Sequence, residues 1–419
     1  MIFLTPACLK CVICGKEFSP SGITYTCDVC GQDGTLDVIY DIKSIRKNLS
    51  HKSFSLNNDR TMWRYSEILP VENTKNIPEL SVGGTPLYRS ANLEHKYNVS
   101  ELYIKDDGRN PTGSLKDRAS ALCVAKALDA RDKTGASELP IIACASSGNA
   151  ASSLAGFAAV SGLKTYIFVP KNVPAAKITQ LLVYGANTIL VEGDYSDAFN
   201  LAAAAIEHFC WYNRNCAINP YLLEGKKTCA LEIAEQLNWN VPDRIFISVG
   251  DGCCISSLYK GFSDLLELGF IERLPKITGV QAEGASPIFK AFAEGSDKVT
   301  FSSANTIADS ISVGSPRNWA KALRAVSRTD GELMTVSDAD ILKAIPELAR
   351  YSGVFAEPAG AAAFAGFCHM ALCGKLKSCE RIAIVITGNG LKDIDSAKKS
   401  TGKALSCVPD IKTFIKLTF

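Results

Sequence analysis

Residues 140–170 read PIIACASSGNAASSLAGFAAVSGLKTYIFVP: an apolar run, a loop of small polar residues, an Ala-rich stretch and a second apolar run. Short apolar runs are typical of buried strands, and the Ala-rich stretch has the length and spacing of a helix. The same alternation continues through residues 187–209, 244–269 and 277–295 and ends in the apolar run at 381–386. It predicts an α/β fold with two open twisted sheets flanked by helices.

The length of the chain and its net charge limit the classes of function that it is expected to have. The 419 residues suffice for two lobes and an accessory segment. The net charge of +2 gives no global field that would attract nucleic acid or an anionic membrane. The chain has no apolar run long enough to span a bilayer, and we expect no secretory signal at its start. We therefore expect a cytoplasmic protein that binds small molecules or its own copies, with no nucleic-acid and no membrane partner.

Two CxxC pairs lie near the N-terminus, Cys11 with Cys14 and Cys27 with Cys30. This spacing is typical of a zinc ribbon, in which four thiolates surround one Zn²⁺ and leave no open position for catalysis. The alternative is a set of reduced thiols or a redox pair, and Cys8 also forms a CxxC with Cys11. We expect residues 1–45 to form a zinc-ribbon-like segment with a structural zinc ion.

Lys116 follows a run of turn residues, Asn110–Gly113, and stands at the entry to a predicted helix. The positive end of a helix dipole lowers the pKa of a nearby lysine, and a neutral amine is the form that attacks a carbonyl to make a Schiff base. The alternative interpretation is a solvated lysine in the first turn of a helix.

The loop Ser146-Ser147-Gly148-Asn149 joins a predicted strand to a predicted helix. Its hydroxyls and amides can therefore form an anion site at a helix N-terminus, suited to a carboxylate or a phosphate. A helix cap without a ligand is the alternative.

Two further loops follow predicted strands. Gly250 and Gly252, after the strand at 244–249, let backbone approach a ligand closely, so this loop can cradle a phosphate. Asp251 would repel a phosphate, and we expect its side chain to point away. Thr387 follows the last strand. Because ligands collect at the carboxyl ends of strands in open α/β sheets, the lysine segment and the loops predict one shared cleft.

Six motifs, in the same order along the chain, resemble those of the fold-type II pyridoxal-phosphate enzymes and, within them, the threonine synthase family. They are GTPLYR (84–89), NPTGSLKDR (110–118), ASSGNAAS (145–152), NPYLLEGKKT (219–228), GVFAEPAGAAA (353–363) and TGNGLKD (387–393). The resemblance implies a homodimer with two lobes in each chain. Residues 46–239 would carry the Schiff-base lysine and the loop for the substrate carboxylate, and residues 240–419 the phosphate loop and the partner of the pyridine nitrogen.

The resemblance also implies roles for single residues. Lys116 and Thr387 are the expected catalytic residues, Lys116 by holding pyridoxal 5'-phosphate covalently and Thr387 by facing its pyridine nitrogen. Asn149 would bind the ring hydroxyl of the cofactor. The cofactor phosphate would bind to Gly250, Asp251, Gly252, Cys253, Cys254 and Ile255. The substrate would bind to Ser146, Ser147, Gly148 and Asn149.

The implied reaction is that of a carbon–oxygen lyase, which converts O-phosphohomoserine and water to threonine and phosphate by γ-elimination and β-addition. Family members often have Arg where Leu222 stands and Gln where Lys226 stands. Because Arg suits a bidentate grip on phosphate, Lys226 or Lys227 would have to compensate here. The alternatives are a cysteate synthase-like activity on O-phosphoserine and a threonine dehydratase-like activity. A different class, a zinc-ribbon binding protein with a cofactor-free core, remains open at this point.

Overall fold

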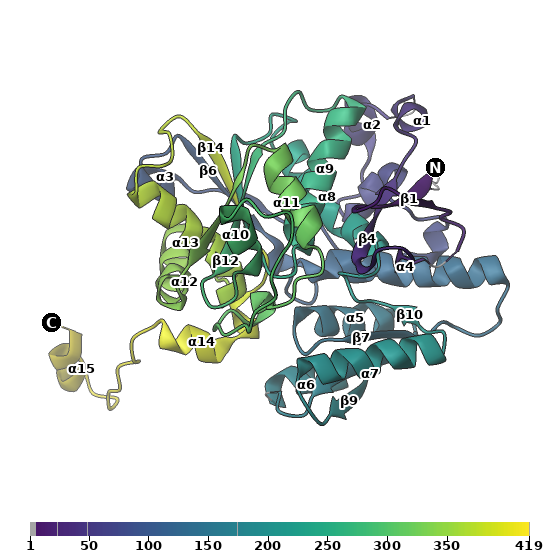
Figure 1. The fold of residues 1–419 in the computed structure, drawn as a ribbon. Coiled ribbons are helices and arrows are strands. Elements are labelled where there is room, and N and C mark those ends of the chain that lie inside the picture. Colours follow the sequence, from purple (N-terminus) through teal and green to yellow (C-terminus); the bar gives the residue numbers. More distant parts are fainter. Residues whose placement is uncertain (1–5, 23, 48, 174, 419) are drawn as a thin grey trace.

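The computed structural model describes residues 6–22, 24–47, 49–173 and 175–418, and its strands form three sheets (Figure 1). The sheet orders are β2-β1-β4-β3, β10-β7-β8-β9 and β13-β12-β11-β14-β6-β5. The second and third of these sheets are flanked by helices, which confirms the predicted α/β fold. None of the described helices has the length and hydropathy needed to cross a membrane.

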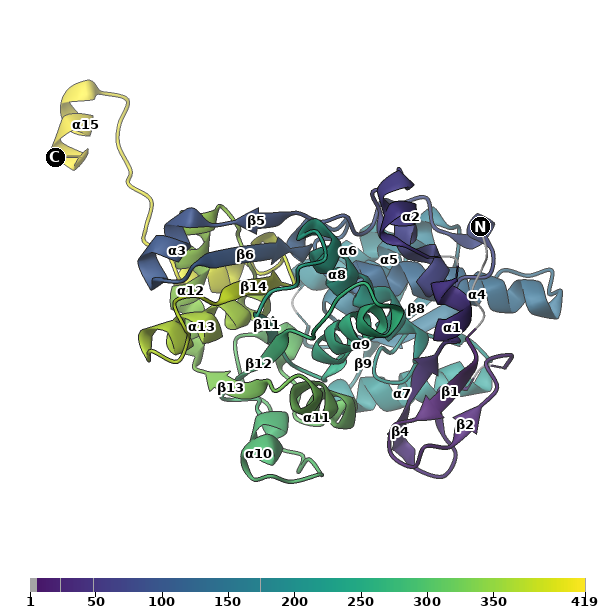
Figure 2. The same ribbon diagram turned by 90° about the horizontal axis from the view of Figure 1, so that it is seen from above.

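The six-stranded sheet is parallel except for the pair β5–β6. Helix α13 (Pro358–Leu372) packs on one of its faces, while α9 (Cys253–Leu268) and α11 (Trp319–Arg328) pack on the other (Figure 2). Its strands are β5 (Leu87–Arg89), β6 (Glu101–Asp106), β11 (Arg244–Ser248), β12 (Lys276–Ala282), β13 (Glu332–Val336) and β14 (Arg381–Ile386).

The four-stranded parallel sheet contains the stretch at 140–170, which forms strand, helix and strand as predicted. Its elements are β7 (Ile142–Ala145), α5 (Asn149–Val160), β8 (Thr165–Pro170), α6 (Ala175–Val183), β9 (Asn187–Val191), α7 (Tyr195–His208) and β10 (Tyr212–Asn213). Helices α4 (Lys116–Thr134) and α8 (Tyr221–Gln236) pack together, and they link this sheet to the larger one through α5 and α9. Strands β5 and β6 precede residue 240, yet they lie in the six-stranded sheet with strands that follow it. The division of the chain into two lobes at residue 240 stays a prediction.

The N-terminal segment forms a small antiparallel sheet that docks on α11. Lys321 donates a hydrogen bond to the Leu36 carbonyl at 2.6 Å, and Arg324 forms an ion pair with Asp37 at 2.7 Å. Just before α11, the Arg317 guanidinium donates to the Gln32 side chain at 2.6 Å. The strands are β1 (Cys8–Cys11), β2 (Glu17–Phe18), β3 (Thr26–Cys27) and β4 (Gly31–Ile39), the last including the strand expected from Leu36 onward.

The remaining helices lie in the connections between these elements and at the C-terminus. After the last strand, α14 is followed by α15, which stands away from the body of the molecule (Figures 1 and 2). These helices are α1 (Ile42–Arg46), α2 (His51–Leu56), η1 (Met62–Ile68), η2 (Thr74–Asn76), α3 (Ala91–Tyr97), η3 (Asp107–Arg109), α10 (Pro287–Ala293), η4 (Asp309–Ile311), α12 (Asp338–Ser352), η5 (Gly390–Lys392), α14 (Ile394–Lys399) and α15 (Ile411–Thr418).

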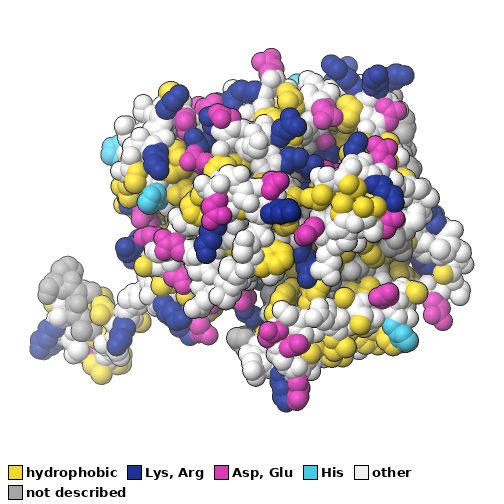
Figure 3. Space-filling view, in the orientation of Figure 1, with side chains coloured by type: hydrophobic (Ala, Val, Ile, Leu, Met, Phe, Trp, Pro, Cys, Tyr) yellow, Lys and Arg dark blue, Asp and Glu magenta, His cyan; other side chains and the backbone are white. Residues whose placement is uncertain are grey.

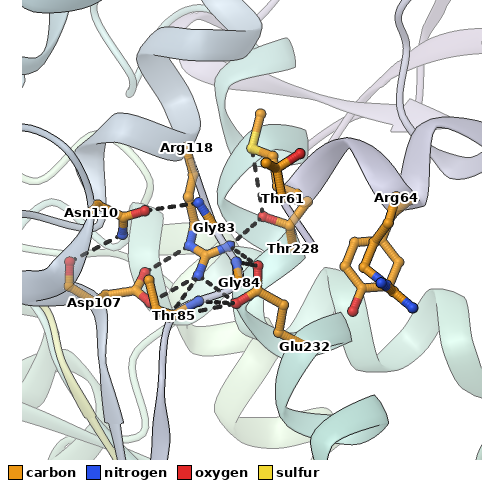
Figure 4. Close-up of polar contacts among 12 residues, drawn as sticks. Thr61, Arg64, Gly83, Gly84, Thr85, Asp107, Asn110, Arg118, Thr228 and Glu232 are labelled. Atoms are coloured by element: carbon orange, nitrogen blue, oxygen red, sulfur yellow. Dashed lines mark hydrogen bonds and ion pairs between the residues drawn. The ribbon is translucent and has the colours of Figure 1, made fainter. Parts of the chain in front are cut away.

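A buried network of charges joins α4 and α8 to the six-stranded sheet (Figure 4). The Arg118 guanidinium, with no exposed surface, contacts Asp107 at 2.7 Å and Glu232 at 2.6 Å. Lys105 of β6 contacts the other Glu232 oxygen at 2.7 Å. Burial disfavours ionisation of Glu232, but Arg118 and Lys105 outweigh it and hold its pKa well below the usual range. The network therefore fixes the start of α4, where Lys116 stands.

Glu232→Gln is expected to destabilise the fold strongly, because it leaves Arg118 and Lys105 buried with one anion fewer. Breaking a buried ion pair by removing one partner costs about 3–5 kcal/mol. Urea unfolding should show this loss of free energy. The matched control is Glu192→Gln, which removes an exposed ion pair with Lys171 and should change stability by less than about 1 kcal/mol. Equal losses in the two variants would contradict this account of the network.

Candidate active site

Lys116 and Thr387 lie on segments that run side by side. Lys116 is half-buried and begins α4, and Thr387 directly follows β14. The Leu115 amide donates to the Thr387 carbonyl at 2.9 Å, and Ser114 pairs with Gly388 in an antiparallel bridge. The lysine is therefore held at the carboxyl end of the six-stranded sheet, beside the loop that carries Thr387.

Asn149 connects the loop after β7 to Glu357, which immediately precedes α13. The buried Asn149 amide donates to a Glu357 carboxyl oxygen at 2.7 Å and to the Ser310 hydroxyl at 3.2 Å. A Cβ on Gly388 would lie 2.3 Å from that same Glu357 oxygen, so only glycine leaves room for the carboxyl beside Thr387. Ser146, Ser147 and Gly148 are half-buried and precede Asn149.

The Glu357 carboxyl has an unusually high pKa. Burial raises its pKa to about 7, against the opposing effects of Lys392, Lys116 and the hydrogen bond from Asn149. A carboxyl of this pKa changes its protonation state near neutral pH, beside the two segments that carry Lys116 and Thr387. Strongly shifted acids of this kind are concentrated at functional sites.

The glycine loop between β11 and α9 lies next to Lys116. The Cys254 thiol is 3.9 Å from the Lys116 amine. Gly252 has φ +89°, and a Cβ there would lie 2.7 Å from the Asn318 carbonyl oxygen, which no side chain would tolerate. The backbone amides at the start of α9, from Cys253 through Ile255, thus stand at a helix N-terminus with its partial positive charge.

The Asp251 carboxyl is bound by the segment before α11, and its other oxygen lies 3.9 Å from the Cys253 sulfur. Its carboxyl accepts a hydrogen bond from the Arg317 amide at 2.6 Å, and its carbonyl accepts one from the Asn318 amide at 3.0 Å. Burial raises the pKa of Asp251 to about 6, although the Arg317 amide and guanidinium counteract it. On the opposite side of the loop, a Cβ on Gly250 would lie 2.9 Å from the Ile311 Cα. The loop is therefore braced on both sides.

Three cations near this loop form no salt bridge among the described residues: Lys116, Arg214 and Lys226. Lys226 is 1% exposed, and its amine has no hydrogen-bond partner in the described part of the chain. Burial disfavours its ammonium, but the thiols of Cys216, Cys253 and Cys254 outweigh this and keep its pKa above the usual value. Lys227, by contrast, is paired with Glu224 and Asp264, each at 2.6 Å. Lys226, and not Lys227, is thus available to compensate for the Arg that family members often have where Leu222 stands.

Cys11, Cys14, Cys27 and Cys30 are brought together in the N-terminal sheet, apart from the residues around Lys116. Their four sulfur atoms all lie within 4.8 Å of one another, and those of Cys14 and Cys27 are 3.7 Å apart. A tetrahedron of Zn–S bonds of about 2.3 Å places its sulfurs about 3.8 Å apart. The donor set and its spacing are therefore compatible with zinc.

Sequence reasoning missed several residues of the site. Ser310 and Arg214 lie in segments without a recognisable motif, and only the fold brings them to Asn149 and Lys226. Glu357 stands in the quoted motif at 353–363, but the motif does not reveal that its carboxyl reaches Asn149. Cys216 carries no pattern that distinguishes it from the other scattered cysteines.

Glu357→Gln is expected to change how stability depends on pH. The folded pKa of about 7 exceeds the ordinary 4.5, so the contribution of Glu357 is fully present below pH 4.5 and is lost as pH rises through 7. Between about pH 5.5 and about pH 8, the wild type should lose roughly 2 kcal/mol that the variant does not lose. Urea unfolding of both proteins across this range measures the difference. Parallel pH profiles would contradict the assignment.

Comparisons with known proteins identify the family. The family model described as "Pyridoxal-phosphate dependent enzyme" matches residues 78–388. Threonine synthase of Methanocaldococcus jannaschii is 39% identical over 97% of this chain and 98% of that protein. Threonine synthase of Methanosarcina acetivorans is 39% identical over 92% of each chain.

A solved structure supports the fold. The processed form of threonine deaminase isoform 2 from Solanum lycopersicum superposes with a TM-score of 0.63 at 23% identity, covering 76% of this chain and 87% of that one. A Schiff-base lysine candidate, a glycine loop at a helix start and buried cations without carboxylate partners are a donor set that fits pyridoxal phosphate. The chain belongs to the pyridoxal-phosphate-dependent enzyme family, and within it to the threonine synthases.

Proposed function

We propose that this protein converts O-phosphohomoserine and water to threonine and phosphate. The observation that carries the proposal is the buried Lys226 ammonium, which has no hydrogen-bond partner among the described residues and lies by the thiols of the glycine loop. A buried cation without a partner is costly unless an anion joins it. With Arg214 and Lys116 nearby, this region carries the charge to bind a phosphorylated amino acid, and the related threonine synthases support that choice of substrate.

The residues around Lys116 would hold pyridoxal phosphate. Lys116 would bind it covalently, Asn149 would bind its ring hydroxyl, and Thr387 would face its pyridine nitrogen. The loop from Gly250 to Ile255 would bind its phosphate through the amides at the start of α9. When bound, the cofactor supplies an electron sink that stabilises negative charge at the carbon next to the substrate amine.

Thr387 would give the pyridine nitrogen of the cofactor a neutral hydrogen-bond partner. A hydroxyl, unlike a carboxylate, does not force protonation of the ring nitrogen, so the electron sink is weaker and transamination is discouraged. This favours elimination and replacement chemistry. The position of Thr387 is set by the backbone bond from Leu115, which ties it to the segment of Lys116.

Lys116 would also move protons. Once its amine is free, it would take the proton from Cα of the substrate and return protons to the carbons from which phosphate leaves and to which water adds. Such a base acts in its neutral form. Ser146, Ser147 and Gly148 would hold the substrate carboxylate beside Asn149, and Lys226 its phosphate.

Glu357 would set the orientation of Asn149. Its carboxyl and the Ser310 hydroxyl both accept hydrogen bonds from the Asn149 amide nitrogen. An amide NH₂ has two protons, so donation of a hydrogen bond from Asn149 Nδ2 to a ring hydroxyl would require one of these partners to release it. Glu357 would thus couple the orientation of Asn149 to a carboxyl that titrates near neutral pH.

The four clustered cysteines would bind a structural zinc ion, because four thiolates leave no coordination position for a substrate. We also infer that the enzyme is a cytoplasmic homodimer. The sixteen cysteines are all free, as expected in a reducing compartment. On the face shown in Figure 3, Lys and Arg side chains are interspersed with Asp and Glu. Such a surface gives no reason to expect a nucleic-acid partner.

Incubation with a panel of substrates tests the reaction. O-Phosphohomoserine should release phosphate and yield threonine, while O-phosphoserine with sulfite and threonine alone should give little product. Phosphate and keto acid are measured in each case. Cysteate from O-phosphoserine, or keto acid from threonine, would replace the proposal by one of the two related activities. Lys116→Ala should lose both the yellow colour of the holoprotein and the release of phosphate.

Lys226→Met should weaken binding of the phosphorylated substrate. Hydrogen bonds to charged groups contribute about 1.5–3 kcal/mol, so the KM for O-phosphohomoserine should rise roughly tenfold to a hundredfold. Steady-state kinetics measure this, and Lys226→Arg should recover part of the loss because it restores the charge. Lys171→Met, which alters an exposed lysine, is the control. An unchanged KM in Lys226→Met would remove Lys226 from the site.

A further inference from the structure

Two cysteine thiols that the proposed reaction does not use lie beside the glycine loop. Cys216 follows β10, and Cys253 is the first residue of α9. They pack together in a small cluster with Ala217 and Leu223, and their thiol groups are hydrogen-bond partners. The two cysteines are thus close neighbours that belong to different elements of the fold.

The surroundings of Cys216 favour its ionised form. The Arg214 guanidinium donates to the Cys216 sulfur at 3.4 Å. The hydrogen bond from Cys253, followed by the charges of Lys226 and Arg214, holds the pKa of Cys216 well below the usual value. The pKa of Cys253, by contrast, is raised by its hydrogen bond to Cys216 and by its burial. Cys216 is therefore the thiol of the pair that ionises more readily.

Access differs between the two thiols. Cys216 is half-buried, whereas Cys253 is only 5% exposed. The Cys253 sulfur accepts a hydrogen bond from the side-chain amide of Asn318 at 3.1 Å. A small oxidant from solution would therefore reach Cys216 first. Partial exposure beside cations is the environment of reactive cysteines.

We propose that Cys216 is a peroxide-reactive thiolate and that Cys253 is the thiol that closes a reversible disulfide with it. The Cys216 thiolate attacks hydrogen peroxide, which forms an S–O bond, breaks the O–O bond and releases hydroxide. Cys253 then attacks the sulfenic sulfur, so that an S–S bond forms, the S–O bond breaks and the Cys253 proton leaves with the hydroxyl as water. A dithiol reductant reverses the oxidation.

The disulfide would act on the glycine loop. It would tie the turn after β10 to the first residue of α9, and it would remove the thiolate that stands beside Arg214 and Lys226. The effect on activity rests on the proposed function, since it requires that this loop hold the cofactor phosphate. The thiol chemistry itself is independent of the substrate.

The test exposes reduced holoprotein, freed of reductant, to graded hydrogen peroxide. Samples are trapped with dimedone or with an alkylating agent, digested without reduction and analysed by mass spectrometry. We expect a sulfenic acid at Cys216, followed by a peptide pair joined through Cys216 and Cys253. The exposed Cys210, whose sulfur lies 3.9 Å from the Glu207 carbonyl oxygen, is the internal control, and Cys216 should oxidise at least about tenfold faster.

Variants separate the two steps. Cys253→Ser should accumulate the sulfenic acid without the disulfide, and Cys216→Ser should show neither while its cofactor absorbance persists after peroxide. The proposal is wrong if Cys216 oxidises no faster than Cys210, or if Cys253 is found joined to Cys254. If the disulfide forms but O-phosphohomoserine releases no phosphate, the thiol pair stands and the proposed reaction fails.

Discussion

The contact between Arg118 and Glu232 is the constraint on which the arrangement of the site depends. Arg118 belongs to the same helix as Lys116, and Glu232 belongs to α8 with Lys226. Their ion pair, with no exposed surface on the guanidinium, sets the register between the two helices. Lys105 and Asp107 then tie both helices to the end of β6. A displacement here would move the amine and the buried ammonium together, since neither lies on a flexible loop.

Charge compensation distinguishes the site from the rest of the interior. Buried cations elsewhere are paired with carboxylates, as Lys227 is with Glu224 and Asp264. Around Cys216, the cations Arg214 and Lys226 have thiols as neighbours instead. A single thiolate at Cys216 would balance only one of these two cations, so this region carries an excess of positive charge. An anionic ligand and a thiolate are two ways to meet the same deficit.

The sequence predicted the sheets well, because each apolar run ends in a loop of Gly, Ser or Asn. The strand at 165–170 and the helix entry at Lys116 lie where the pattern places them. Pairing across long separations was not predictable: nothing near Leu102 indicates that β6 pairs with β14 and carries β5 at the edge of the same sheet. The site shows the same limit. Motifs marked Asn149 and Lys226, but a motif does not encode which side chain fills the space beside Gly388, and the fold alone reveals Glu357.

The docking of the N-terminal sheet has a consequence for the order of events during synthesis. Gln32 accepts a hydrogen bond from the guanidinium of Arg317, which lies 285 residues later in the chain. The backbone amide of Arg317 also donates to the Asp251 carboxyl. The first strands leave the ribosome long before their landing surface exists. Until α11 emerges, the Leu36 carbonyl and Asp37 lack the partners, Lys321 and Arg324, that bind them in the folded chain. The contact between the N-terminal sheet and α11 therefore cannot form until the chain has been synthesised through Arg328.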